Sequence, residues 1–153
     1  MPEVVNPEKS AIIALRKLLL GILLLGMLGS GTELVLLRHT EDVQQWIPLA
    51  LLGCGLILCA WHGLNGCIPA TRVIRWLMIG FIIGGALGVY FHYQGLAEFK
   101  RESNPGLVGW DLAWQAIRGK TPPLLAPGAL IQLGLVGLVY TYKHPALRRV
   151  EGE

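Results

Sequence analysis

Residues 18–37 read LLLGILLLGMLGSGTELVLL, a run of 20 residues in which Glu33 carries the only charge. At a rise of 1.5 Å per residue, an α-helix of this length measures about 30 Å, the thickness of the hydrocarbon core of a bilayer. Further apolar stretches follow at residues 46–62, 76–94 and 124–142. We therefore predict an all-α protein, a four-helix transmembrane bundle that forms a single integral membrane domain over residues 1–153.

The composition agrees with a lipid environment. Hydrophobic residues make up 53% of the 153 residues and charged residues only 15%, against about 25% charged in soluble domains. The net charge is +3, and no basic run is longer than two residues. Nucleic-acid binding needs a basic face, which is missing here, so we expect no nucleic acid as a partner. The predicted partner is the lipid bilayer.

The first apolar run resembles a secretory signal, because Arg16 and Lys17 precede it and the small residues Gly29, Ser30 and Gly31 follow its most apolar part. The run nevertheless continues to Leu37, beyond these small residues. An uncleaved membrane anchor is therefore the predicted role of this segment.

Lysine and arginine predict the orientation. If the N-terminus is cytoplasmic, eight of the 13 Lys and Arg residues lie on the cytoplasmic side. This bias predicts that both termini are cytoplasmic, in a bacterial cytoplasmic (inner) membrane. Aromatic side chains, which favour the headgroup region, mark the predicted span ends. They are Trp46, Trp61, Trp76, Tyr90, Tyr93, Tyr140 and Tyr142.

The third loop, between the spans at 76–94 and 124–142, is the only long connection. Within residues 107–118, Trp110, Ala113, Trp114 and Ile117 recur at helical spacing. We predict a short helix here that lies flat at the membrane interface or caps the bundle.

Packing within lipid depends on close backbone approach, which small residues permit. Gly80, Gly84 and Gly88 form a ladder on one face of the third span, which we predict to be the most tightly packed. Gln132 lies near the middle of the fourth span. Because an amide in hydrocarbon needs a partner, we predict that Gln132 is buried and hydrogen-bonded across helices.

The candidate site lies at the outer ends of spans one and three. Glu33 is the only carboxylate within a predicted span, and ionisable groups in spans are functional candidates. With His39 and His92 it could bind a divalent transition metal, and the two histidines could be axial ligands of a haem. Alternatively, Glu33 reaches the interface or pairs with Arg38. His62 and His144 form a second pair, at the inner ends.

The sequence contains no Walker A, G-x-S-x-G, H-E-x-x-H or Rossmann motif, so we do not expect an enzyme. The first hypothesis is a structural or accessory subunit that forms a homo-oligomer or joins a larger membrane complex. The second is a metal- or haem-binding redox protein with its site at the outer face. The third is an oligomeric transporter or channel.

Overall fold

The computed structural model describes residues 7–38, 42–66, 68–119 and 127–148, which are helical apart from short connections and contain no β-strand. The predicted all-α class is therefore confirmed for these residues. The helices in chain order are α1 (Pro7–Leu36), α2 (Val43–Asn65), α3 (Ile68–Ser103), α4 (Gly109–Ile117), α5 (Gly128–Thr141) and α6 (Pro145–Arg148).

Three of these helices, α1, α2 and α3, are long and apolar enough to cross a membrane. They contain nearly all of the predicted span 18–37 and all of 46–62 and 76–94 within longer helices, because polar residues at the ends continue the helical pattern. The fourth apolar helix, α5, has only 14 residues and falls short of that length. Its predicted span starts at residue 124, outside the described residues.

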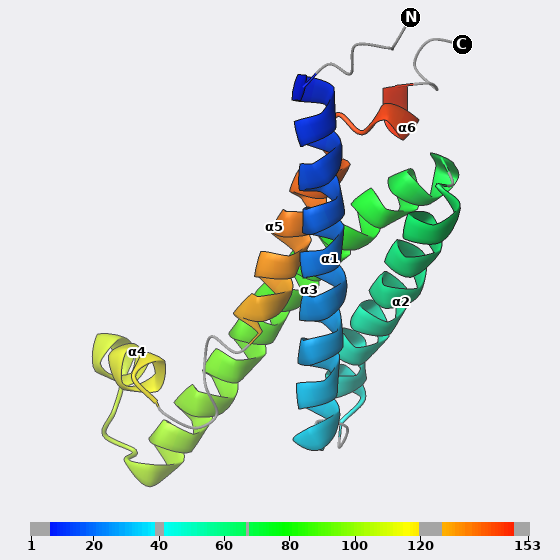
Figure 1. Ribbon diagram of the computed structural model, residues 1–153. Coiled ribbons are helices and arrows are strands. Elements are labelled where there is room, and N and C mark those ends of the chain that lie inside the picture. The colour runs from blue at the N-terminus through cyan, green and yellow to red at the C-terminus, as the bar shows by residue number, and fades with distance from the viewer. Residues whose placement is uncertain (1–6, 39–41, 67, 120–126, 149–153) are drawn as a thin grey trace, which may run out of the picture.

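Four helices form a closed ring of contacts, in which α1 packs on α2, α2 on α3, α3 on α5 and α5 on α1. The first turn of α1 and the short helix α6 lie at the same end of the molecule (Figure 1). The end of α1 and the start of α2 lie at the opposite end. Helix α3 continues beyond its neighbours and carries α4 near its far end.

The core lies along the axis of this ring. Each of the four helices supplies large side chains that are almost fully buried, and they form one cluster. Its buried members include Leu23, Met27, Leu52, Ile74, Met78, Phe81, Leu130 and Leu133. Because burial is confined to one face of each helix, the opposite faces carry exposed apolar side chains.

Glycines let α3 and α5, the pair with the most extensive contact, approach closely. Ile131 lies over Gly85, and Pro127 lies over Gly88. On α5, a methyl group added to Gly134 would come within 2.7 Å of the Met78 carbonyl oxygen. The glycine ladder of the third span therefore meets helices of the same chain, and Gly84 likewise faces Leu51 of α2.

The structure contradicts the prediction for Gln132, whose side chain is exposed on the outer face of α5. The buried positions of α5 include Leu130, Leu133, Gly134 and Gly137. These positions share one side of a helix, and Gln132 falls on the other side. The need to bring the glycines against α3 therefore determines which way α5 is rotated.

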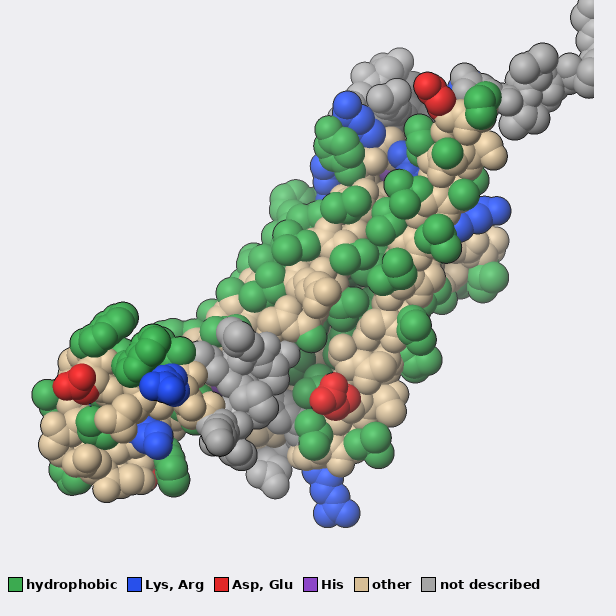
Figure 2. Space-filling model, turned by 60° about the vertical axis from the view of Figure 1, so that its left-hand side comes forward, with side chains coloured by type: hydrophobic (Ala, Val, Ile, Leu, Met, Phe, Trp, Pro, Cys, Tyr) green, Lys and Arg blue, Asp and Glu red, His purple; other side chains and the backbone are tan. Residues whose placement is uncertain are grey.

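The outer surface is largely apolar between the two ends of the molecule. Hydrophobic side chains cover the elongated body, whereas most charged side chains lie towards its ends and on α4 (Figure 2). Leu25 of α1 is 73% exposed, and Ile57 of α2 is 69% exposed. Soluble monomers rarely expose apolar patches of this extent, so the surface suits contact with lipid.

Helix α4 confirms the predicted short helix, and it packs on α3 through the face opposite its tryptophans. Leu112 and Ala116 are its buried residues, and Ala116 clusters with Leu96 and Ala97 of α3. Trp110 and Trp114 stack on each other, with ring centroids 6.3 Å apart, on the exposed side. The small Ala116 permits the closer approach to α3, which turns the indole rings outward.

Candidate functional site

The structure gives only part of the predicted outer site. Glu33 lies in the last turn of α1 with an exposed side chain, and His92 is half-buried on α3. His39 lies outside the described residues. The Glu33 carboxylate and the His92 imidazole therefore lie on different helices, towards the same end of the ring.

Glu33 lies on α1 and His92 on α3, and these two helices do not pack extensively on each other. Helix α1 packs mainly on α2 and α5. Within the described segments, no group of three His, Cys, Asp or Glu side chains could hold a metal ion. The set of Glu33, His39 and His92 depends on His39, so the metal or haem site remains a prediction.

A second polar group, which we call the histidine cluster (Arg16, His62, Tyr140 and His144), lies at the opposite end. The His62 and His144 rings meet edge to face, with centroids 5.3 Å apart. The Tyr140 ring centroid lies 6.1 Å from that of His62 and 5.6 Å from that of His144. The two histidines that the sequence pairs by depth are thus direct neighbours.

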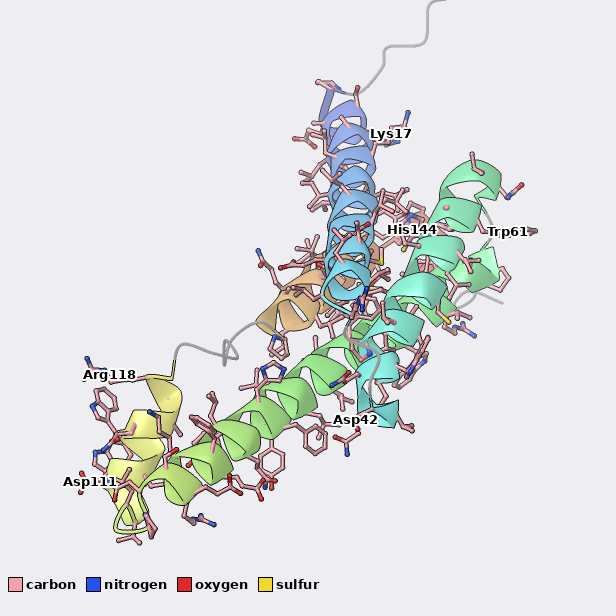
Figure 3. The ribbon with its side chains drawn as sticks, turned by 90° about the horizontal axis from the view of Figure 1, so that it is seen from below. Lys17, Asp42, Trp61, Asp111, Arg118 and His144 are labelled. Atoms are coloured by element: carbon pink, nitrogen blue, oxygen red, sulfur yellow. The ribbon has the colours of Figure 1, made fainter. Side chains whose placement is uncertain are left out.

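Local structure brings these side chains together from three different helices and a turn. Gly66 ends α2 in a left-handed conformation with φ 60°, and its N–H donates to the His62 carbonyl oxygen at 2.8 Å. This cap directs the chain back into α3, which leaves the His62 side chain buried inside the ring. His144 follows the end of α5 and lies beside α1 and α2 in Figure 3.

Arg16 connects the start of α1 to the end of α5. Its guanidinium Nη2 donates to the backbone oxygen of Lys143 at 3.0 Å and reaches that of Tyr142 at 3.5 Å. Carbonyl groups at a helix C-terminus have no partner within the helix and carry partial negative charge, which a cation stabilises. Arg16 therefore caps α5 from another helix.

The environment of His144 favours its neutral form. Burial has the largest effect on the pKa of the imidazole, and the nearby Arg16 guanidinium and His62 act in the same direction, so that together they lower this pKa from 6.5 to about 4. A neutral imidazole offers one donor and one acceptor nitrogen. At neutral pH the His144 ring is consequently uncharged and lies near the permanent positive charge of Arg16.

Helix α3 adds Thr71, which is fully buried and whose hydroxyl makes no hydrogen bond among the described residues. The antiparallel register that sets Ile131 beside Gly85 and Gly137 beside Met78 places Thr71 level with the turn around His144. All four helices of the ring thus bring a polar side chain to one end of the bundle.

The contacts within the histidine cluster hold the adjacent ends of α1, α2 and α5 together. Sequence reasoning identified His62 and His144 but treated Arg16 and Tyr140 only as flanks of spans. The signal for Arg16 was present, because it stands two residues before the apolar run at 18–37, at the depth where a neighbouring antiparallel span ends. Its partner among the helices was not visible in the sequence.

The chain matches no protein-family model, and no curated protein or solved structure shows significant similarity to it. The function of this protein is therefore inferred from its fold and its surface alone.

Proposed function

We propose that this protein is a structural or accessory subunit of a membrane assembly, with four spans and both termini on the cytoplasmic side of a bacterial inner membrane. The observation that carries this proposal is the arm formed by the end of α3 and by α4. This arm presents Trp110, Trp114 and Ile117 as exposed apolar side chains beyond the ring of helices.

The four-span arrangement is supported by the antiparallel course of α5. Contacts of Pro127 with Gly88 and of Gly137 with Met78 show that α5 runs alongside most of the apolar part of α3. The start of α1 and the end of α5 meet through Arg16. This meeting supports the proposed even number of crossings, because Arg16 and Lys143 lie at the same end of the ring of helices.

The arm is the part of the molecule best placed to contact a partner outside the hydrocarbon. With 36 residues, α3 measures about 54 Å, well beyond the roughly 30 Å that a span requires. Its last turns carry Glu98, Lys100, Arg101 and Glu102, which indicates an aqueous or headgroup environment. Figure 3 shows α4, with Asp111 and Arg118, beside the far end of α3 and away from α1, α2 and α5.

A photo-crosslinking amino acid at position 110 tests the proposal in native membranes. We expect a discrete crosslinked product with one protein, identified by mass spectrometry, and no such product from position 57. Ile57 is the matched control because it is also exposed but lies on the lipid-facing side of α2. Crosslinks to lipid alone from both positions would refute a subunit that binds through α4.

Epitope tags test the topology separately. Tags at both termini should be digested by protease in inside-out vesicles and protected in right-side-out vesicles. A tag inserted between Asn104 and Pro105 should show the opposite pattern. Opposite sidedness of the two termini would contradict an even number of spans.

The transporter hypothesis gains no support from the polar residues of the spans. Thr32, Glu33 and Gln132 are all exposed on the outside of the ring. Thr32 also uses its hydroxyl to donate to the Leu28 carbonyl oxygen of its own helix at 2.8 Å. These side chains do not line a route through a single chain.

A further inference from the structure

We propose that two copies of this chain associate through the outer face of α5, with the Gln132 amides of the two copies hydrogen-bonded to each other. The face consists of Ala129, Gln132, Leu135 and Val139, which are exposed at helical spacing. This inference deepens the proposed function and rests on it, because it names a partner within the bilayer.

The depth of Gln132 is fixed by its neighbours on two sides. The preceding residue, Ile131, packs on Gly85, the midpoint of the predicted span at 76–94. The following residue, Leu133, packs on Gly26, near the midpoint of the run at 18–37. Gln132 therefore lies at the middle of the apolar belt, farthest from the water on either side.

An amide at this depth is unfavourable unless another polar group satisfies it. Gln132 makes no hydrogen bond to the residues that the structure describes, and its side chain is exposed. Hydrocarbon offers neither donors nor acceptors, and burying an unpaired amide costs several kcal/mol on transfer scales. Glutamine side chains in spans accordingly form hydrogen bonds between helices.

A second copy fits this requirement by symmetry. All copies insert with the same orientation, so a two-fold axis between them runs along the membrane normal and brings equal depths together. The glutamine amide contains both a donor and an acceptor, so it can pair with its own counterpart. Ala129, one turn before Gln132, is small enough for the two α5 helices to approach each other. Leu135 and Val139, which follow Gln132 on the same face, supply apolar contact.

Disulfide trapping in native membranes tests which face is shared. In a chain carrying Cys54→Ala and Cys67→Ala, Ala129→Cys and Leu135→Cys, which leave the Gln132 amide in place, should give a crosslinked dimer under mild oxidation. Ile57→Cys on α2 and Leu25→Cys on α1 are matched controls, since both positions are exposed and apolar. These two should remain monomeric. Equal crosslinking at all four positions, or none at 129 and 135, would overturn the inference.

The contribution of the amide is measured by subunit counting or FRET in lipid vesicles of the purified protein. Gln132→Leu should raise the dissociation constant of the dimer about tenfold, since hydrogen bonds between helices contribute about 1–2 kcal/mol in model peptides. Gln132→Asn should retain part of the affinity. A wild-type chain that is monomeric in bilayers would overturn the inference, while a crosslink from position 110 to another protein would leave the proposed function intact.

Discussion

The Nη2 atom of Arg16, in the third turn of α1, donates a hydrogen bond of 3.0 Å to the backbone oxygen of Lys143, which follows α5. This contact joins residues 127 positions apart and closes the ring of helices. We expect Arg16→Gln to lower the free energy of unfolding by about 1 kcal/mol. The substitution removes a hydrogen bond from a charged group, and such a bond stabilises a fold only modestly when it is exposed. Thermal unfolding in detergent measures this loss, and Lys17→Gln is the control without a capping contact.

Close packing of α5 on α3 depends on Gly134. An alanine methyl group there would lie 2.7 Å from the Met78 carbonyl oxygen and 3.2 Å from the Ile82 nitrogen, and backbone atoms cannot move aside cheaply. We expect Gly134→Ala to destabilise the fold by about 1–3 kcal/mol, the typical cost of overpacking. Gly21→Ala, where nothing lies within 4 Å, should be neutral or stabilising. Equal effects of the two substitutions in a detergent unfolding assay would contradict this packing.

Acidification should destabilise the end of the bundle that contains His144. The pKa of His144 is about 4 in the folded chain and 6.5 in the unfolded chain, so the unfolded chain binds more protons between these values. Stability should therefore fall as the pH drops from about 6.5 to about 4, with no further loss from this group below. Tm recorded against pH in detergent should show this slope, and His144→Gln should flatten it. If the slope of Tm against pH is unchanged in His144→Gln, a group other than His144 causes the pH dependence.

Docking of α4 on α3 should depend on Leu96, which is 2% exposed and clusters with Ala116. Leu96→Ala removes this contact, and substitutions of this kind cost about 2–5 kcal/mol in well-packed cores. Because α4 is held by few buried residues, we expect the loss to be local. Hydrogen exchange of the α4 amides should accelerate while that of α1 and α2 stays unchanged. Ile117→Ala, on the exposed side of α4, is the control.

The metal or haem hypothesis makes its own prediction. If His92 is an axial ligand of a haem, freshly purified protein has a Soret band that His92→Ala shifts or removes. If Glu33, His39 and His92 bind a transition metal, elemental analysis after dialysis against a weak chelator shows about one equivalent, which Glu33→Gln reduces. Protein with neither a Soret band nor bound metal would reject both forms.

The sequence by itself determined that the chain is helical and apolar, and it located the apolar centre of each long helix, whereas α1 begins well before its predicted span and α3 extends beyond its span at both ends. Hydrophobic run length is a local property, and a backbone surrounded by lipid must satisfy its hydrogen bonds within each helix. The prediction of a short helix in the third loop succeeded for a similar reason, because the spacing of Trp110, Trp114 and Ile117 is local. His39 lies outside the described residues, so its part in the outer site remains a prediction.

Only the tertiary structure decided how each helix is rotated and which ends meet. The outward position of Gln132 differs from the prediction, whereas the sequence left open which side of α4 packs on α3. Both orientations follow from small residues on the packed side. Gly134 and Ala116 allow a closer approach than any large side chain, so they determine the packed face. The meeting of Arg16 with Lys143 likewise required the register between α1 and α5, which no pattern within a single helix contains.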